Sequence, residues 1–447
     1  MDGVTRAKWV ERQWLPVGGP GLGRRARQGG TYLAFSPAPL ANRHVVIPSE
    51  LARKADRVER KILALARRDA EFTSGLEGVS RFLLRSEAIS SSRIEGIAPG
   101  PDKVAIAEII NVDVDSRAAT VPQLVANNVR VLHELSRHVH DSGELNAGDI
   151  ISMQALLLGG SAPGGFRDSQ NWIGGSNYSP LEAEFVPPPP EFVPELMNDL
   201  MDYLGGAAHG ALIQAALVHA QFETIHPFAD GNGRVGRALI HAVLQRRGLV
   251  GSPVLPISMV LGTWSQRYVD GLTRFREIED SSAGVCEWID VFLDAADEAA
   301  DQASRITREL DALQAEWQQR MSAHRAKTGM KRALRSDSIE HRILARLADH
   351  PLLTAPVAAE IFGTSRTSSG KALENLAAAG IVRRKSIDRG VTGYLADDVF
   401  ELITLAERRM ASTRFDTAIA PPLARPVPAA PTPALPSPRD RAASPPR

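Results

Sequence analysis

The chain has 447 residues, which is too long for one ordinary hydrophobic core, and this length predicts two or three domains. It carries 52 basic and 52 acidic residues, so the chain as a whole has no electrostatic preference for nucleic acid or an anionic membrane surface. Its one cysteine, Cys286, excludes an intramolecular disulfide, and no apolar run is long enough to span a membrane. Because the N-terminus also lacks a secretory signal, we expect a cytoplasmic protein that does not bind membranes.

The first half of the sequence alternates between helical patterns and polar connections. Residues 1–30 are rich in Gly and Arg, and we predict that they are disordered. From Pro48 onward apolar residues recur at helical spacing, and Ser49 is a suitable N-cap for the first helix. Further helical patterns cover residues 77–95, 102–112, 121–141 and 147–158.

Residues 165–190 show a different pattern. Aromatic and β-branched residues stand on both sides of Gly174-Gly175-Ser176-Asn177, which predicts a β-hairpin between Trp172 and Val186. Helical patterns then resume at residues 191–204, 209–224 and 234–247, and a long charged helix is expected over 286–325.

The C-terminal part reads as a separate unit. Three short helical patterns precede two extended pieces, which is the order of a winged helix-turn-helix. The cations expected to face outward are Arg366 and Lys371 on the recognition helix and Arg383, Arg384, Lys385 and Arg389 on the wing. Because winged helices also serve as protein-docking and dimer modules, DNA binding and a homodimer both stay open here.

The segment from residue 226 to residue 237 reads His-Pro-Phe-Ala-Asp-Gly-Asn-Gly-Arg-Val-Gly-Arg, and it concentrates chemically useful groups. Gly231 and Gly233 permit a tight backbone whose N–H groups, at the start of a helix, form a nest for an anion. Arg234 and Arg237 share one helix face and oppose the helix dipole, so they need negative charge nearby. The pattern therefore predicts a phosphate site.

Two further side chains of this segment suit a phosphate reaction. Asp230 can hold Mg²⁺, which proteins usually bind through one or two carboxylates together with phosphate oxygens. His226 titrates near neutral pH and can accept a proton from an attacking hydroxyl.

This segment resembles the signature of Fic-domain proteins, His-Pro-Phe-x-(Asp/Glu)-Gly-Asn-Gly-Arg-x-x-Arg, at every specified position. The resemblance implies transfer of AMP from ATP to a Ser, Thr or Tyr hydroxyl of a target protein, with release of pyrophosphate. By position, the implied roles are general base for His226, Mg²⁺ ligand for Asp230, α-phosphate cradle for Gly231, Asn232 and Gly233, β-phosphate contact for Arg234 and γ-phosphate contact for Arg237.

A second element lies upstream, where residues 91–96 read Ser-Ser-Arg-Ile-Glu-Gly. Gly96 is placed to end a helix, but Glu95 in the last turn is unfavourable against the helix dipole and is either solvated or paired with a distant cation. Many Fic proteins carry an inhibitory (Ser/Thr)-x-x-x-Glu-(Gly/Asn) motif, which Ser91, Glu95 and Gly96 fit. The resemblance implies that Glu95 pairs with Arg237 at the γ-phosphate position and keeps the enzyme off.

The predicted hairpin corresponds in position to the flap of Fic proteins. The resemblance implies that its edge holds an extended segment of the target through main-chain hydrogen bonds. Ile173, Gly174 and Gly175 are the expected contacts, and a purely structural hairpin is the alternative.

The predicted fold is mainly α, with a helical Fic core, a β-hairpin flap and a C-terminal winged helix-turn-helix. The predicted domains are a disordered N-terminus (1–30), an N-terminal helical extension with the inhibitory motif (31–120), the Fic catalytic core (121–285), a helical connector (286–330), the winged helix-turn-helix (331–410) and a disordered Pro/Ala-rich tail (411–447).

The predicted function is that of an autoinhibited protein adenylyltransferase that uses ATP and Mg²⁺ and also modifies itself. Removal of AMP from a modified protein, or transfer of another nucleotide, is the alternative within the enzyme class. A DNA-binding regulator whose Fic core only senses a nucleotide is the alternative from a different class.

Overall fold

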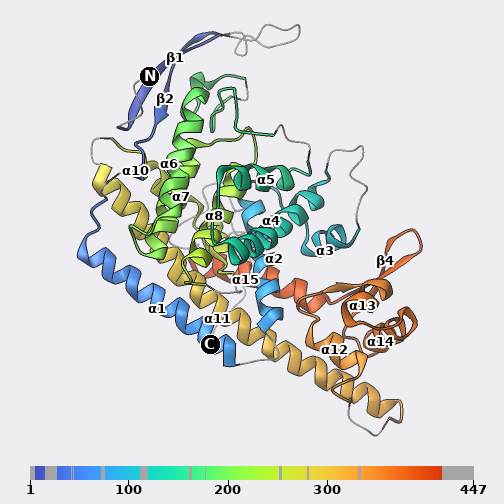
Figure 1. The fold of residues 1–447 in the computed structure, drawn as a ribbon. Helices are drawn as coiled ribbons and strands as arrows, with labels where there is room; N and C mark the ends of the chain where they lie inside the picture. Colours follow the sequence, from blue (N-terminus) through green and yellow to red (C-terminus); the bar gives the residue numbers. More distant parts are fainter. Residues whose placement is uncertain are drawn as a thin grey trace, which may run out of the picture.

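The computed structural model describes residues 6–15, 28–41, 43, 45–71, 76–110, 119–160, 164–176, 178–250, 254–278, 281–330 and 334–414. The described chain is mainly helical, which confirms the predicted fold class (Figure 1). The helices of the body are α1 (Ser49–Glu71), α2 (Leu76–Ile94), α3 (Pro101–Ile109), α4 (Val121–Ser142), α5 (Ala147–Leu157), α6 (Val193–Gly205), α7 (Ala211–Ile225), α8 (Asn232–Arg246), α9 (Ile257–Thr263), α10 (Ser265–Phe275) and α11 (Ser281–Lys327).

Local sequence signals explain several of the helix ends. The hydroxyl of Thr120 and the side chain of Gln123 form a capping box at the start of α4, which ends at Gly143 in a left-handed conformation. At the start of α5, the side chain of Asn146 accepts the N–H groups of Gly148 and Asp149. These caps explain why both helices begin where the sequence predicts.

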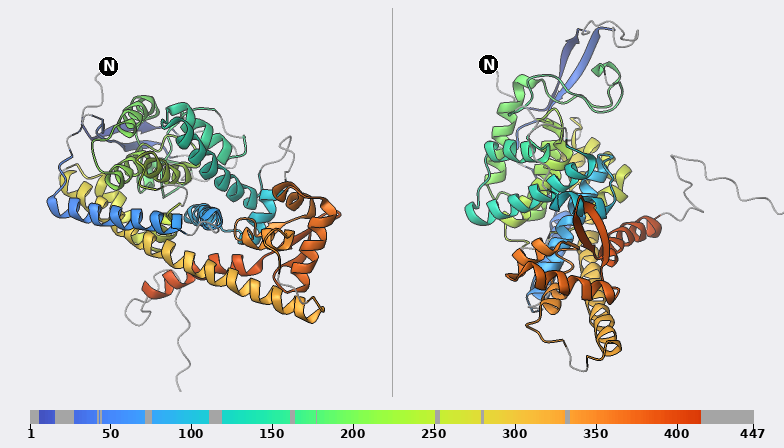
Figure 2. Two further views of the ribbon diagram at one scale, coloured as in Figure 1. Left: turned by 60° about the horizontal axis from the view of Figure 1, so that its bottom comes forward. Right: turned by 90° about the vertical axis from the view of Figure 1, so that its right-hand side faces the viewer.

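The long helix α11 connects the body to the C-terminal part of the chain, and α1 packs along its first half (Figures 1 and 2). Lys54 of α1 pairs with Asp290 (2.5 Å) and Asp294 (2.6 Å) of α11. Two turns further on, Lys61 pairs with Asp297 and Asp301, both at 2.8 Å. The apolar face of α1 is therefore flanked by a ladder of ion pairs to α11.

The N-terminal segment corrects one prediction. Lys8–Trp14, which we predicted to be disordered, forms strand β1 and pairs antiparallel with β2 (Gly30–Ser36). The aromatic rings stabilise this ribbon, because Trp9 contacts Phe35 with 5.0 Å between ring centroids and Trp14 contacts Trp172 at 5.4 Å. The Gly/Arg-rich composition of residues 1–30 concealed this short alternating segment.

The flap at residues 172–186 is less regular than a two-stranded hairpin. Its chain reverses direction and forms a single antiparallel bridge between Ile173 and Phe185, and a 3₁₀ turn at Pro180–Glu182 fills the space between them. A second 3₁₀ turn, Pro190–Phe192, leads into α6. The four consecutive prolines at 187–190 limit the ladder, because proline has no N–H to donate.

The part of the chain from residue 334 to residue 414, here called the C-terminal module, has the predicted order of elements. Its elements are α12 (Ile339–Ala345), β3 (Leu352–Leu353), α13 (Ala355–Phe362), α14 (Arg366–Ala378), β4 (Arg383–Asp388), β5 (Val391–Leu395) and α15 (Asp397–Arg414), with the sheet order β3-β5-β4. Helix α15 was not predicted. The tail predicted to be disordered, 411–447, includes the end of α15, and residues 415–447 lie outside the described residues.

Three of the four predicted wing cations are paired with carboxylates within the chain. Arg383 donates two hydrogen bonds to Asp397 (2.5 and 2.8 Å), Arg384 lies 3.4 Å from Glu374, and Lys385 lies 3.1 Å from Asp102 of α3. The C-terminal module also forms an apolar cluster with α3, made of Ala105, Leu352, Leu395 and Phe400. The module is therefore packed onto the body rather than hanging free.

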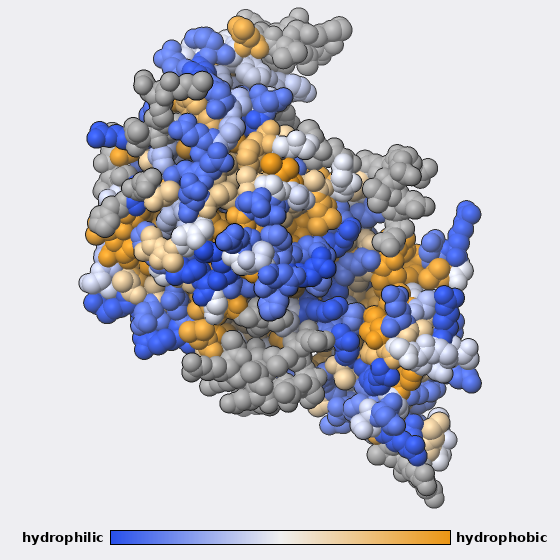
Figure 3. Space-filling view, viewed as in Figure 1, coloured by the Kyte–Doolittle hydropathy of each residue, from blue (hydrophilic) through white to orange (hydrophobic). Residues whose placement is uncertain are grey.

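The face of the molecule in Figure 3 is mostly hydrophilic, with hydrophobic residues in smaller patches. Among the described residues, no helix is both long and apolar enough to cross a membrane.

Trp288 of α11 should be essential for the stability of the body. It is fully buried, and its indole N–H donates to the carbonyl of Ala216 in α7 (2.8 Å). We expect Trp288→Ala to lower the free energy of unfolding by about 3–5 kcal/mol, measured by urea denaturation with far-UV circular dichroism. Trp9→Ala, at a position that is 51% exposed, is the control and should cost much less; equal losses would contradict the prediction.

Candidate active site

The motif segment lies at the junction of α7 and α8, two helices in the centre of the body (Figure 1). All 15 residues of α7 are buried, and α8 is buried from Asn232 to Leu244. The two helices approach closely at Gly236, where a Cβ atom would lie 2.4 Å from Oε1 of Glu223. The glycine at this position lets α8 pack against α7 and fixes the segment between them.

The backbone of His226 has an unusual conformation. With φ of 50° and ψ of 59°, it is the one non-glycine residue with positive φ in the described part of the chain. Its N–H donates to the carbonyl of Phe222 (2.8 Å), which ends α7. Its carbonyl accepts hydrogen bonds from Nε of Arg167 (2.9 Å) and Nδ2 of Asn171 (3.2 Å). Such a conformation costs about 1–3 kcal/mol and persists only where its surroundings enforce it.

The imidazole of His226 is poised to accept a proton. Burial lowers its pKa to about 4, and the positive charges of Arg276 and Arg167 act in the same direction. The ring is therefore neutral at pH 7. Its Nδ1 atom has no hydrogen-bond partner among the described residues.

The loop after His226 is held by Asn232. The Asn232 side chain accepts the N–H of Phe228 (2.8 Å) and donates to the carbonyl of the same residue (2.7 Å). Asn232 is only 2% exposed, so its amide holds the loop and is not free to contact a phosphate. The α-phosphate contact expected for Asn232 stays a prediction, in which its backbone N–H belongs to the nest that begins at Gly231 with φ of 87°.

Arg234 is a buried cation with unused hydrogen-bonding capacity. It is 2% exposed, and its Nε and Nη1 atoms have no hydrogen-bond partner within the described chain. Its Nη2 lies 3.7 Å from Oδ1 of Asp230, a side chain that is 72% exposed. A buried guanidinium with unpaired donors is costly, and an anionic ligand would satisfy it.

Arg237 is bonded to the upstream element through two of its nitrogen atoms. Its Nη2 donates to Oε1 of Glu95 (2.8 Å) and to the carbonyl of Ser91 (2.8 Å), and its Nε donates to the hydroxyl of Ser91 (2.9 Å). The Glu95 carboxylate also lies against the nest, because a Cβ atom at Gly233 would stand 2.0 Å from its Oε1. The structure thus joins Ser91, Glu95 and Arg237, although about 140 residues separate them in sequence.

The charges around Glu95 show where the motif side chains converge. Burial alone would raise the pKa of Glu95, but Arg237, then Arg234 and His226, lower it below its ordinary value. Conversely, burial would lower the pKa of Arg237, and Glu95 raises it. At pH 7, where His226 is neutral, the two motif arginines stabilise this one carboxylate, which stands where an anion is favoured.

A second buried carboxyl lies behind this pair. Burial raises the pKa of Glu223 to about 7, whereas Arg237 acts in the opposite direction. Its Oε1 has no hydrogen-bond partner among the described residues. The sequence analysis gave Glu223 no role.

The predicted docking residues Ile173, Gly174 and Gly175 take part in the internal structure of the flap. The N–H and carbonyl of Ile173 are both bonded to Phe185, at 2.8 and 3.2 Å, so its main chain is already paired within the flap. Gly174 and Gly175 have φ of 73° and 72° and form the turn. A Cβ atom at Gly175 would lie 2.3 Å from the carbonyl oxygen of Glu182, which explains the glycine there.

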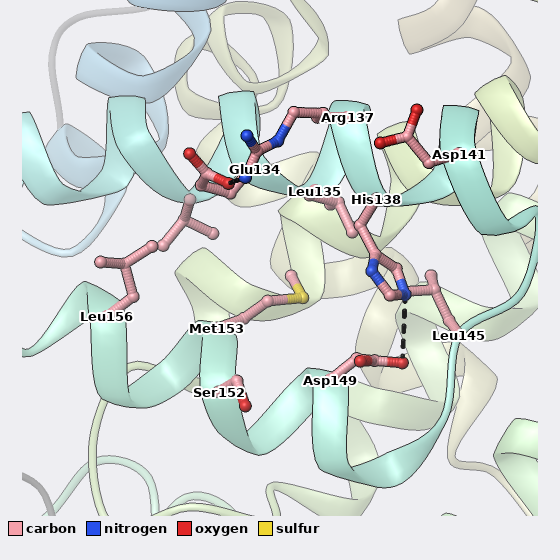
Figure 4. Close-up of a pocket in the computed structure, with 11 residues that line it drawn as sticks. Glu134, Leu135, Arg137, His138, Asp141, Leu145, Asp149, Ser152, Met153 and Leu156 are labelled. Carbon is pink, nitrogen blue, oxygen red and sulfur yellow. Dashed lines mark hydrogen bonds and ion pairs between the residues drawn. The ribbon is translucent and has the colours of Figure 1, made fainter.

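A separate cavity of about 280 Å³ lies between α4 and α5, beside the motif (Figure 4). Apolar side chains such as Leu135 and Met153 line it, and His138 and Asp149 approach to 3.4 Å at its rim. Helix α5 also contacts the motif loop, because Nε2 of Gln154 donates to the carbonyl of Asp230 (3.2 Å).

Sequence reasoning missed Arg167, Asn171 and Arg276 as neighbours of His226. Arg167 and Asn171 lie in a loop about 55–60 residues before it, and Arg276 follows α10 some 50 residues after it. No periodicity or spacing rule connects such positions. Only the fold brings them to the end of α7.

Comparisons with known proteins agree with this geometry. Residues 144–244 match the model of the Fic/DOC family. The chain is 32% identical over 184 residues to a probable protein adenylyltransferase of Aquifex aeolicus (strain VF5), a match that covers 39% of this chain and 52% of that protein. It is 30% identical over 148 residues to protein adenylyltransferase fic-1 of Caenorhabditis briggsae, over 32% of this chain and 27% of that protein. Among solved structures, a Fic family protein from Desulfovibrio desulfuricans G20 aligns with a TM-score of 0.46 and 20% identity, over 79% of this chain and 98% of that chain.

The matched residues contain the strained histidine turn, the glycines at the start of α8 and both arginines. Residues 144–244 of this chain therefore carry the features of a Fic/DOC-family domain. Its matched stretch spans about half the length of the Aquifex protein and about a quarter of the Caenorhabditis protein.

Glu95 should compete with any polyphosphate for Arg237 and the nest. We expect Glu95→Gln to bind inorganic tripolyphosphate at least about tenfold more tightly in isothermal titration calorimetry, because a charge-assisted hydrogen bond contributes about 1.5–3 kcal/mol. Glu277→Gln, which removes a carboxylate paired with Arg274 outside the site, is the control. Equal affinity in wild type and Glu95→Gln would show that the carboxylate does not compete.

Proposed function

We propose that this protein transfers AMP from ATP to a Ser, Thr or Tyr hydroxyl of a target protein, and that it also modifies itself. One observation carries the proposal: an anionic group, the Glu95 carboxylate, bonds to Arg237 (2.8 Å) and lies against the nest at Gly233. A triphosphate whose charges replace that carboxylate would lie against the nest and beside a neutral histidine. The names of the relatives, which are protein adenylyltransferases, support the same activity.

The reaction needs only positioning, charge stabilisation and one proton acceptor. The target hydroxyl attacks the α-phosphorus, a new P–O bond forms, and the bond to the β-phosphate oxygen breaks to release pyrophosphate. His226, neutral at pH 7, takes the hydroxyl proton. The N–H groups at Gly231–Gly233 stabilise the developing phosphate charge, and Arg234 and Arg237 bind the β- and γ-phosphates.

Mg²⁺ fits the carboxylate of Asp230. Among the described residues, no group of three or more His, Cys, Asp or Glu side chains is placed to hold a metal alone. The exposed Asp230 carboxylate, bonded to the N–H of Gly231 (2.6 Å), suits an ion whose other ligands are phosphate oxygens and water. Bound there, Mg²⁺ would neutralise phosphate charge.

The default state we propose is off. Glu95 holds Arg237, which would otherwise bind the γ-phosphate, and both Ser91 contacts keep the inhibitory segment in register. Gly96, with φ of 76°, ends this segment. Removal of AMP from a modified target is the alternative reaction, in which Glu95 would orient a water molecule instead.

The flap is the proposed docking site for the target segment. Because Ile173 uses its main-chain groups internally, its side chain and the main chain of Trp172 and Gly174 are the contacts to test.

The C-terminal module is proposed to be a winged helix, and the cytoplasm is the proposed location. DNA binding is not favoured for this wing, because Arg383, Arg384 and Lys385 are paired with carboxylates of the chain itself.

The test is ATP- and Mg²⁺-dependent self-labelling, measured by intact-protein mass spectrometry on three proteins. We expect Glu95→Gly to gain AMP faster than wild type. Adding His226→Ala to Glu95→Gly should lower labelling by at least about 10²–10⁴-fold, the contribution of general-base catalysis. Undiminished labelling by the double variant would remove His226 as the base, and equal labelling by wild type and Glu95→Gly would remove the inhibition.

A further inference from the structure

Two arginines hold the last turn of α7 against the flap and the prolines that follow it, and the first of them is Arg167. Its guanidinium donates from Nε to the carbonyl of His226 (2.9 Å), from Nη2 to Pro188 (2.6 Å) and from Nη1 to Ser169 (3.2 Å). Its main-chain N–H donates to the carbonyl of Pro227 (2.9 Å). Arg167 is 7% exposed, and each of these bonds ends on a carbonyl rather than on a carboxylate.

The second arginine, Arg276, makes the corresponding link from the other side. Its Nη2 and Nε lie 3.3 Å from the carbonyl of Glu223 and the hydroxyl of Thr224, both in the last turn of α7. Its guanidinium carbon lies 3.7 Å from the ring centroid of Phe185, the flap residue that forms the bridge with Ile173. A cation at this helix end is favoured by the exposed carbonyls and the helix dipole.

Burying a guanidinium without a carboxylate partner is costly, and none of the contacts given for Arg167 or Arg276 is to a carboxylate. Both arginines converge on the turn whose strained backbone carries the proposed base. We infer that Arg167 and Arg276 are positioning residues for His226, which fix its turn relative to the flap that receives the target. This inference rests on the proposed transfer reaction.

The same two arginines favour the neutral form of the His226 imidazole. The charges that act on His226 are Arg276 and Arg167, which lower its pKa, and Glu95, which raises it; a main-chain hydrogen bond at Glu223 also raises it. Removing one positive charge should therefore raise the pKa of His226 toward its ordinary value near 6.5. A merely structural role would not move this titration.

The experiment compares Arg276→Gln, Arg276→Lys and the control Arg274→Gln. Arg274 lies in the last turn of α10, two residues before Arg276, but pairs with Glu277 and Glu287 outside the site. The His226 titration is followed by NMR of ¹³C-histidine-labelled protein, with His226→Asn for assignment. Self-labelling is measured in the Glu95→Gly background.

We expect Arg276→Gln to raise the His226 midpoint and to lower kcat about ten- to a hundredfold, with KM for ATP unchanged. Arg276→Lys should keep the midpoint low but still lose kcat, because the contact with Phe185 is lost. An unchanged titration together with normal labelling in Arg276→Gln overturns the inference. If no variant labels at all, the transfer proposal fails, and the titration still decides whether Arg276 acts on His226.

A different set of contacts connects the C-terminal module to the inhibitory segment. Glu95 lies in the turn between α2 and α3, and the module contacts both helices. On the α2 side, Glu407 of α15 accepts a hydrogen bond from the hydroxyl of Ser90 (3.0 Å) and pairs with Arg93. Ser90 directly precedes Ser91, and Arg93 is two residues before Glu95.

On the α3 side, the contacts are apolar and ionic. Ala105 packs with Leu352, Leu395 and Phe400 of the module, and Asp102 pairs with Lys385. The segment that carries Glu95 is thus held at both ends by the module. Any displacement of α15 would change the freedom of the turn that presents Glu95 to Arg237.

As a second inference, the geometry points to the C-terminal module as the part of the chain that strengthens inhibition by Glu95. Given the proposed autoinhibition, loss of the Glu407 contacts should loosen the turn and favour the active state. Arg93 is 41% exposed and Glu407 13% exposed, so the pair is only partly screened by solvent.

The test uses Glu407→Gln, with Arg409→Gln as the control. Arg409 is on the same helix and pairs with Glu309 of α11. We expect Glu407→Gln to label itself about three- to tenfold faster than wild type, the effect of one partly exposed charge-assisted contact. It should also exchange backbone amide hydrogens of residues 90–97 faster, whereas Arg409→Gln should change neither.

The double variant Glu95→Gly/Glu407→Gln tests whether Glu407 affects labelling through Glu95 or independently of it. If the module acts through Glu95, it should label no faster than Glu95→Gly alone. Equal acceleration in both backgrounds, or no change in labelling and exchange in Glu407→Gln, overturns the inference. If Glu95→Gly itself is no faster than wild type, autoinhibition fails, and the exchange data still show whether Glu407 holds the turn.

Discussion

The site depends on one buried cation, Arg237, and on which anion neutralises it. A guanidinium removed from water requires a partner of opposite charge, and losing that partner strongly destabilises a protein. In this structure Glu95 and Ser91 supply the partner from a helix far away in sequence. Because the same charge can be neutralised by a phosphate, the interaction that stabilises the resting protein also competes with the proposed substrate.

The close packing of α7 and α8 sets the geometry in which Glu95 and a phosphate would compete for Arg237. Gly236 lets the helices touch, and the strained turn at His226 lies between them under the control of Arg167 and Asn171. The rigid part of the site is therefore the histidine turn and the nest. The adjustable part is the segment carrying Glu95, which is held by contacts to Arg237 on one side and to Glu407 and α3 on the other.

Sequence patterns predicted most helices because their periodicity and caps are local. The helical patterns predicted over 121–141 and 147–158 start where α4 and α5 start. Predictions that depended on partners far away in the chain were less accurate. Strand β1 was hidden by its Gly/Arg-rich surroundings, and the flap shows one bridge in place of two strands because its second half is followed by prolines.

The sequence by itself determined the chemical inventory of the site. The glycines, the histidine and the two arginines follow one another within a dozen residues, so their identity and spacing already indicate a phosphate nest at a helix start. Tertiary structure decided what each group faces. It assigned the Asn232 amide to the loop and brought Glu95 to Arg237; it also placed two unforeseen cations, Arg167 and Arg276, at the histidine turn. Burial and long-range charge pairing depend on how helices pack, and no local spacing encodes that arrangement.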